Sequence, residues 1–238
     1  MWPDYEAALF DLDGVITPTA EVHMRAWSEM FNAFLEDYTD GTAAPYTSAA
    51  YFAYVDGKPR YDGVRSFLTS RDIALPEGEP DDSPDAVTVC GLGNRKNEAF
   101  NEVLERDGVK AYPGSVRLLD HLAELDLGLA VVSSSANATT VLSAAGLAER
   151  FAAVVDGRVA RDAQLAGKPS PETFIHAATL LGAEPARTVV LEDALSGVQA
   201  GAAGGFGAVV GVDRGAGADK LTANGATVVV SDLAELIP

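Results

Sequence analysis

The sequence predicts an α/β protein in which a doubly wound parallel sheet carries an inserted helical cap domain. Three observations favour this fold class. Short, continuous apolar runs recur along the chain, as in parallel strands that are buried on both faces. Stretches with helical spacing separate these runs, which is typical of β-α-β units. Residues 18–110 contain helical patterns and no comparable apolar run, so they are predicted to form the inserted domain.

Six apolar runs are candidate strands of the sheet. The first is Ala7-Ala8-Leu9-Phe10, close to the N-terminus, and the others lie in the second half of the chain. A parallel sheet built from such runs, with helices on both faces, is Rossmann-like. The later candidates are 127–132, 188–191 and 207–211, with weaker ones at 152–155 and 226–230.

Helical patterns fill the remaining segments. Between the strand candidates lie two apolar stripes with helical spacing, Val116, Leu119, Leu122 and Leu125, and Phe174, Ala178 and Leu181. Before them come the predicted helices 20–36, 61–71 and 92–107, which turn-rich joints at 37–45 and 75–84 separate. We therefore expect an α/β core formed by residues 1–17 and 111–238, and a helical domain formed by residues 18–110.

Composition limits the classes of protein to which the chain can belong. Of its 238 residues 47% are hydrophobic, which is enough for a sizeable core, and its net charge of −18 disfavours nucleic acid as a partner. We find no apolar run as long as a membrane span and no signal-peptide pattern. The single cysteine, Cys90, cannot form an internal disulfide. We therefore expect a cytoplasmic monomer whose partner is a small molecule.

Charged and hydroxyl side chains follow the predicted strands at the points where those strands end. The carboxyl ends of parallel strands meet at one edge of the sheet, where open α/β sheets bind ligands. We therefore expect one crevice to collect an acid pair, a serine cluster, a lysine and an acidic doublet. These are Asp11 and Asp13, Ser133, Ser134 and Ser135, Lys168, and Glu192 and Asp193.

Phosphoryl transfer uses this set of groups. A carboxylate such as Asp11 can be the nucleophile, and Asp13 is placed to act as general acid and base. The lysine can neutralise the phosphate, while the serine hydroxyls and backbone N–H groups can hold its oxygens. Mg²⁺ prefers a few carboxylates together with substrate phosphate and water. The predicted metal ligands are Asp11, Asp13, Glu192 and Asp193.

These motifs together resemble the four motifs of the haloacid dehalogenase-like phosphotransferase superfamily. The matching residues are Asp11-Leu12-Asp13-Gly14-Val15, Ser133, Lys168-Pro169 and Glu192-Asp193. Their order and separation match across nearly the whole chain. The resemblance implies an aspartyl-phosphate mechanism with Mg²⁺, and it implies that the inserted helical domain is the superfamily's cap.

A narrower resemblance is to the β-phosphoglucomutase-like family. It rests on 14–27, on 57–62 and on Arg95-Lys96-Asn97, and the serine motif continues similarly to Asn137. The resemblance implies that the cap contributes substrate contacts, with Arg60 binding the phosphate that is not being transferred. The residues carried over in this way are His23, Trp27, Arg60, Lys96, Asn97 and Asn137. The chain departs from the family at Pro18 and in the cap loops around 38–47 and 76–90.

The resemblance implies a phosphosugar mutase that interconverts β-D-glucose 1-phosphate and glucose 6-phosphate through a bisphosphate. A phosphatase, in which water attacks the aspartyl-phosphate, needs the same core residues and remains open. A non-catalytic phosphosugar-binding regulator and a metal-independent dehalogenase are further alternatives.

Several of these residues also have a purely structural interpretation. The serine Ser133 can cap the following helix, and Lys168 can be a surface lysine. The histidine His23 can pack beside Trp27 as an ordinary helix residue, and Arg60 can belong to a solvated charge cluster. The aromatic residues Tyr46, Tyr51, Phe52 and Tyr54 are expected to form the core of the helical domain.

Overall fold

The computed structural model describes residues 2–238, so Met1, which belongs to the predicted core, lies outside the described residues. The chain forms two compact units. The sheet unit comprises Met1–Thr19 and Val109–Pro238, and the helical unit comprises Ala20–Gly108. The predicted domain boundaries, 17/18 and 110/111, lie close to these divisions.

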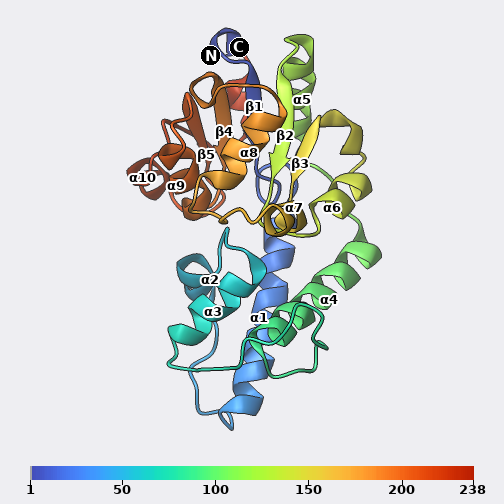
Figure 1. The fold of residues 1–238 in the computed structure, drawn as a ribbon, viewed down its shortest axis with the longest axis vertical. Coiled ribbons are helices and arrows are strands. Elements are labelled where there is room, and N and C mark those ends of the chain that lie inside the picture. Colours follow the sequence, from blue (N-terminus) through green and yellow to red (C-terminus); the bar gives the residue numbers. More distant parts are fainter. Residues whose placement is uncertain (1) are drawn as a thin grey trace. The chain divides into compact units, whose positions relative to one another are not determined.

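A six-stranded parallel sheet forms the centre of the sheet unit, which confirms the predicted fold class (Figure 1). Its strand order is β3-β2-β1-β4-β5-β6, the order of a doubly wound fold. All six predicted strands are present. Their bounds are β1 Ala7–Phe10, β2 Gly128–Val132, β3 Ala153–Val155, β4 Thr188–Glu192, β5 Ala208–Val212 and β6 Val228–Val230.

The central strand fixes which residues meet at the carboxyl edge of the sheet. Strand β1 is fully buried and pairs with β2 on one side and with β4 on the other. Its last residue, Phe10, is in register with Val131 and Leu191. The residues that follow β1, β2 and β4 therefore leave the sheet at the same level.

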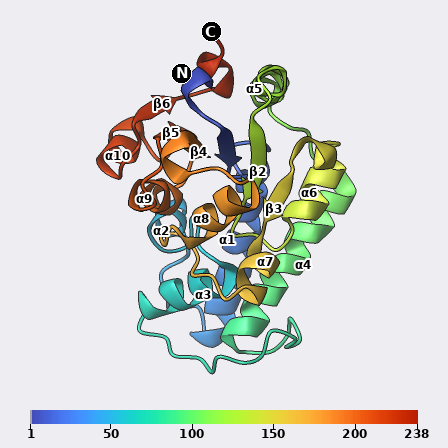
Figure 2. The same cartoon turned by 45° about the horizontal axis from the view of Figure 1, so that its top comes forward.

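Helices pack on this sheet and bury its apolar side chains. Helix α8 packs on β1, β2 and β3, and α9 packs on β4 and β5 (Figure 2). The two chain ends lie together, because Trp2 Nε1 donates a hydrogen bond of 2.9 Å to the carbonyl oxygen of Leu236. The helices of the sheet unit are α5 Pro113–Glu124, α6 Ala138–Ala144, α7 Gly157–Asp162, α8 Glu172–Leu180, α9 Leu195–Ala203 and α10 Ala218–Ala223. Short 3₁₀ segments span Trp2–Asp4, Ala148–Arg150, Pro185–Arg187 and Leu233–Leu236.

Four helices make up the helical unit: α1 Thr19–Tyr38, α2 Ser48–Tyr54, α3 Arg60–Thr69 and α4 Val89–Asp107. The first residue of α1, Thr19, is also the last residue of the first segment of the sheet unit. Three of them match the predicted helices, whereas α2 was not predicted. Threonine caps start the two helices that the apolar pattern misses or shortens. Thr47 accepts from the backbone N–H of Ala50 before α2, and Thr88 accepts from Gly91 before α4. No helix among residues 2–238 is long and apolar enough to span a membrane.

Aromatic side chains form much of the core of the helical unit. The ring centroid of Phe67 lies 4.2 Å from that of Phe31 and 4.9 Å from that of Tyr46. The expectation for the four tyrosine and phenylalanine residues is met in part. Tyr46 and Tyr51 are buried, whereas Phe52 and Tyr54 are 39% and 36% exposed.

We predict that Phe67→Ala lowers the free energy of unfolding of the helical unit by about 3–5 kcal/mol, because it removes a fully buried ring from a packed aromatic core. The matched control is Phe52→Ala on α2, which removes a partly exposed ring and is expected to cost less than about 1 kcal/mol. Urea unfolding followed by tryptophan fluorescence measures both values. Equal losses in the two variants would contradict this account of the core.

Candidate active site

Lys168 lies at the centre of the predicted site and is only 3% exposed. Its ammonium group donates three hydrogen bonds, to Asp11 Oδ1 at 2.5 Å, to Glu192 Oε1 at 2.6 Å and to the carbonyl oxygen of Val132 at 3.0 Å. An ammonium has three donors, so this set satisfies all of them. The three acceptors come from the ends of β1, β4 and β2. The interpretation of Lys168 as a surface lysine is therefore wrong.

Burial and neighbouring charge act on this pair in opposite directions. Burial raises the pKa of the Asp11 carboxyl well above its usual range; Lys168 opposes that rise, and the carboxylates of Glu192 and Asp13 add to it. Burial would lower the pKa of Lys168, but the carboxylates of Asp11 and Glu192 outweigh it, so the pKa of Lys168 is raised. One lysine thus compensates several acidic groups only in part.

Three acidic side chains of the site could share a metal ion. Carboxylate oxygens of Asp11, Glu192 and Asp193 all lie within 4.8 Å of one another. Two of these residues are buried, and close carboxylates with one lysine between them carry more negative charge than that lysine neutralises. A divalent cation would remove this surplus, and carboxylates are ligands that Mg²⁺ accepts. The donor set therefore fits the predicted metal, and Asp13 stays a predicted fourth ligand.

Asp13 lies in a tight loop that begins where β1 ends. The Oγ1 of Thr19 donates a hydrogen bond to Asp13 Oδ1, and Thr19 Oγ1 lies 2.7 Å from Thr17 Oγ1. The loop closes through a backbone bond of 2.7 Å from Gly14 N–H to the Thr17 carbonyl oxygen. Gly14 has a φ of +88°, and a Cβ added there would overlap the carboxylate of Asp193. Glycine is therefore required where this loop passes the acidic doublet.

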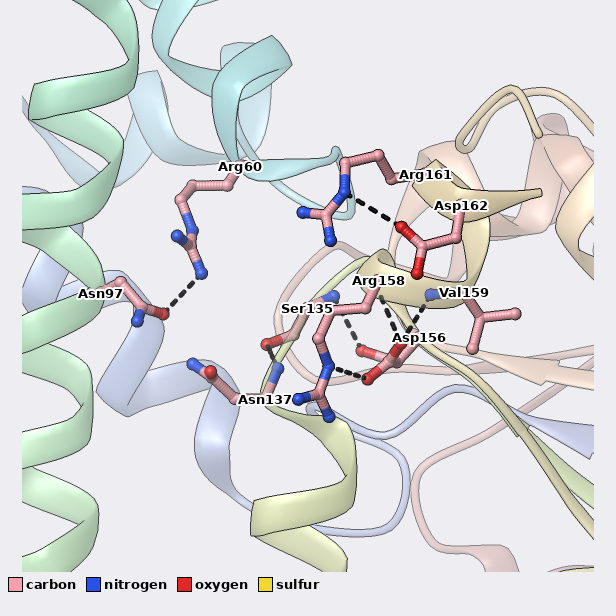
Figure 3. Close-up of polar contacts among 10 residues, drawn as sticks. Arg60, Asn97, Ser135, Asn137, Asp156, Arg158, Val159, Arg161 and Asp162 are labelled. Atoms are coloured by element: carbon pink, nitrogen blue, oxygen red, sulfur yellow. Dashed lines mark hydrogen bonds and ion pairs between the residues drawn. The ribbon is translucent and has the colours of Figure 1, made fainter. Parts of the chain in front are cut away.

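The predicted phosphate-binding serines form a turn after β2. The backbone N–H of Ser135 donates to Ser133 Oγ at 3.1 Å, and the N–H of Asn137 donates to Ser135 Oγ at 3.2 Å (Figure 3). Ser134 lies between these two serines in the sequence. The interpretation of Ser133 as a helix cap is wrong, because α6 starts at Ala138 with Asn137 at its N-cap position.

Three of the predicted substrate residues form one buried cluster in the helical unit: His23 and Trp27 of α1 and Lys96 of α4. His23 stacks on Phe100 with ring centroids 4.0 Å apart and an interplanar angle of 8°. Lys96 donates to His23 Nδ1, since an ammonium has no acceptor, and its nitrogen lies 5.2 Å from the ring centroid of Trp27. His23, Trp27 and Lys96 are at most 9% exposed. A buried lysine amid three aromatic rings is unusual in an ordinary core.

Arg60 starts α3 and reaches across to α4. Its guanidinium donates to Asn97 Oδ1 at 2.7 Å (Figure 3). It also donates to Asn94 Oδ1 at 3.2 Å. The neighbouring acid Asp62 pairs with Arg65 instead. Arg60 is thus held by amide groups of α4, which differs from the solvated charge cluster that was the alternative interpretation of this residue.

Sequence reasoning missed residues that hold the predicted groups in place. Thr19 is the hydroxyl partner of Asp13, and the Thr-Pro-Thr run before α1 is a signal that could have indicated it. Arg214 Nε donates to the carbonyl oxygen of Gly14 at 2.9 Å, and its guanidinium carbon lies 4.0 Å from the ring centroid of Tyr112. Asn94 binds Arg60. No local pattern in the sequence marks the last two.

Comparisons with known proteins agree with the predicted resemblance. A family model described as haloacid dehalogenase-like hydrolase matches residues 5–205. A β-phosphoglucomutase of Mycobacterium bovis is 51% identical, and the match covers 97% of this chain and 91% of the relative. Hexitol phosphatase A of Escherichia coli is 30% identical over 199 residues, covering 83% and 78%. A crystal structure of β-phosphoglucomutase from Clostridium difficile has the same fold, with a TM-score of 0.78 at 24% identity, and the match covers 98% of this chain and 93% of that one.

We predict that Mg²⁺ stabilises the folded protein and that Asp193→Asn removes most of this effect. A ligand at about 100 times its Kd adds roughly 2.7 kcal/mol, which raises the melting temperature of a chain of this size by about 5–10 °C. The matched control is Asp219→Asn, which changes an exposed aspartate of α10. Thermal unfolding at constant ionic strength separates metal binding from general screening of the net charge. An Asp193→Asn variant stabilised as strongly as the unmodified protein would contradict this assignment.

Proposed function

The chain belongs to the haloacid dehalogenase-like hydrolase family, and from this membership we propose that it is a Mg²⁺-dependent phosphosugar mutase. Its proposed reaction interconverts β-D-glucose 1-phosphate and glucose 6-phosphate. The β-phosphoglucomutase that is 51% identical over 97% of the chain supports this choice of substrate. We further propose that residues 1–17 and 111–238 are the catalytic core and that residues 18–110 are a cap.

One observation carries the proposal: Lys168 binds the carboxylates of Asp11 and Glu192 at the carboxyl edge of the sheet. Phosphoryl transfer depends mainly on positioning and on neutralising charge, since the phosphoryl oxygens are negative throughout. A buried lysine held beside a carboxylate nucleophile supplies both. The surplus of acidic groups around it supports a divalent cation as the second source of positive charge.

In the proposed mechanism Asp11 alternates between a free and a phosphorylated carboxylate. A hydroxyl oxygen of the sugar monophosphate attacks the phosphorus on Asp11, the bond from phosphorus to the Asp11 oxygen breaks, and a sugar bisphosphate forms. The bisphosphate then turns over in the site. An oxygen of Asp11 attacks its other phosphorus, and the bond from that phosphorus to the sugar oxygen breaks. The product is the isomeric monophosphate, and Asp11 is phosphorylated again.

Asp13 is proposed to move the proton in both half-reactions. It takes the proton of the attacking hydroxyl in the first, and it gives that proton to the departing sugar oxygen in the second. The hydrogen bond from Thr19 Oγ1 holds one of its carboxylate oxygens in a fixed direction. We propose that Ser133, Ser134 and Ser135 hold the phosphoryl oxygens. Mg²⁺, when bound by the acidic side chains, offsets the charge of the phosphoryl group.

The helical unit is proposed to supply the contacts that choose the sugar. Arg60 binds the phosphate that is not being transferred, and its planar guanidinium suits phosphate oxygens. We propose that Asn137 of the sheet unit contributes a further contact. The remaining proposed contacts of the helical unit are His23, Trp27, Lys96 and Asn97.

A phosphatase is the second candidate function. Hexitol phosphatase A of Escherichia coli, at 30% identity, favours it, and it needs the same groups of the sheet unit. In a phosphatase water attacks the phosphorylated aspartate and frees inorganic phosphate. Exclusion of water is therefore what a mutase needs in addition.

We predict that β-D-glucose 1-phosphate with a catalytic amount of glucose 1,6-bisphosphate gives glucose 6-phosphate as the main product. A coupled dehydrogenase assay measures glucose 6-phosphate, and a molybdate assay on the same samples measures inorganic phosphate. The α-anomer of glucose 1-phosphate is the control substrate. Release of phosphate with no glucose 6-phosphate would contradict the mutase and support the phosphatase.

We predict that Asp11→Asn lowers turnover at least about a thousandfold, because an amide oxygen is a poor nucleophile for phosphorus. The fold of the variant is checked by far-UV circular dichroism. Asp120→Asn, an exposed aspartate of α5, is the matched control and keeps full activity. Mass spectrometry of the acid-quenched protein tests for a phosphoryl group on the chain, which the Asp11→Asn variant lacks. Unchanged turnover in Asp11→Asn would rule out an aspartyl-phosphate at this residue.

A further inference from the structure

The loop between α3 and α4 in the helical unit, residues 75–88, is tied to the start of both helices. We call it the acidic loop. It carries no predicted site residue. One side chain, Asn94 of α4, connects it to Arg60, and this side chain makes four hydrogen bonds in all.

Each polar atom of the Asn94 amide has two partners. Its Oδ1 accepts from Arg60 at 3.2 Å and from the hydroxyl group of Tyr61 at 3.0 Å. Its Nδ2 donates to the carbonyl oxygens of Pro80 at 3.1 Å and of Asp82 at 2.9 Å. A primary amide has two donor hydrogens and two acceptor lone pairs, so the group is fully used.

This pattern fixes which way the amide points. The carbonyl oxygens of Pro80 and Asp82 can only accept, and a guanidinium can only donate. If the amide turned over, its nitrogen would meet Arg60 and its oxygen would meet two carbonyl oxygens. The hydrogen bonds to Arg60, Pro80 and Asp82 would then be lost, and only the Tyr61 hydroxyl, which can also accept, could keep a bond to the amide. The acidic loop therefore determines that an amide oxygen is presented to Arg60.

Side chains of α3 and α4 hold the acidic loop in place, so it can in turn fix the orientation of the Asn94 amide. Arg65 of α3 binds Glu77 through two nitrogen atoms, at 3.0 and 2.7 Å. Thr88, the N-cap of α4, donates to Asp82 Oδ2 at 2.6 Å. Arg95 Nε donates to the Pro84 carbonyl oxygen at 2.8 Å. Side chains of both flanking helices thus anchor the acidic loop along its length.

We propose that Asn94 is a positioning residue that holds the Arg60 guanidinium in the geometry needed to bind a substrate phosphate. This inference rests on the proposed function, in which Arg60 binds the phosphate that is not transferred. Through Asn94 the acidic loop sets the affinity of the helical unit for a phosphorylated sugar. The transfer chemistry at Asp11 does not depend on it.

The first measurement is the KM for β-D-glucose 1-phosphate at saturating bisphosphate. We expect Asn94→Ala to raise KM about tenfold and to change kcat by less than about twofold, because the interaction is with bound substrate in both the ground and the transition state. The matched control is Asn32→Ala. Asn32 also fixes a loop of the helical unit, by accepting from the Tyr46 N–H at 2.8 Å, but it has no bond to Arg60. It is expected to leave KM unchanged.

A double-mutant cycle separates a positioning role from a general structural one. If Asn94 acts through Arg60, the Asn94→Ala change has no further effect on KM once Arg60→Ala is present. A tenfold rise in KM in both backgrounds would overturn the proposal. The cycle can be measured by phosphate release if the protein is a phosphatase. An Arg60→Ala variant with unchanged KM would instead overturn the proposed role of Arg60 and, with it, this inference.

Partial misfolding does not leave the proposal untested. KM does not depend on the concentration of active protein, so a smaller folded fraction lowers the apparent kcat alone. Tyr61→Phe is the milder second variant, since it removes one donor to Asn94 Oδ1 and keeps the ring. It is expected to raise KM about two- to threefold. An unchanged KM in both Tyr61→Phe and Asn94→Ala would overturn the proposal.

Discussion

The site depends on the hydrogen bonds that the ammonium group of Lys168 donates. This group joins acceptors at the ends of three adjacent strands: Asp11 after β1, Val132 at the end of β2 and Glu192 at the end of β4. Burying a lysine costs free energy unless its donors are satisfied and opposite charge lies close by, and both conditions hold for Lys168. The same contacts orient the Asp11 carboxylate. The Lys168 ammonium group therefore both joins the ends of three strands and fixes the direction of the Asp11 carboxylate.

The strand order explains why this is possible. Strand β1 lies between β2 and β4, although about 120 residues separate β1 from β2 in sequence, because the helical unit is inserted between these two strands. The volume of the side chains then limits how closely the segments that follow β1 and β4 can approach each other. A Cβ on Gly14 would overlap Asp193, and one on Gly197 of α9 would overlap Glu192, so glycine at both positions leaves room for the two acidic side chains. The repulsion among those groups is what a divalent cation would relieve.

The sequence predicted the strands and the groups at their ends, because both depend on local pattern. Apolar runs marked all six strands, and Asp11, Glu192 and Asp193 follow from the rule that parallel strands end at a common edge. Lys168 was predicted from the Gly-Lys-Pro loop that carries it. The short helix α2 was not predicted, because a seven-residue helix shows less than two turns of periodicity and depends on its Thr47 cap. Arg214 and Asn94 were not predicted for another reason. Each is defined by a side chain that meets a distant backbone or loop atom, and such a contact leaves no period in the sequence.

The two units hold their polar groups by different means, and this difference bears on how specificity can change. In the sheet unit Lys168 and Asp11 are fixed by the ends of central strands, so altering their positions would disturb the whole sheet. In the helical unit Arg60 is fixed by the amides of Asn94 and Asn97 and, through Asn94, by a surface loop. Loops accept changes in sequence and length more readily than central strands do. Changes in the acidic loop can therefore alter the position of the Arg60 guanidinium without altering that of the Asp11 carboxylate. This separation gives a physical reason why relatives of this chain include both a β-phosphoglucomutase and a hexitol phosphatase.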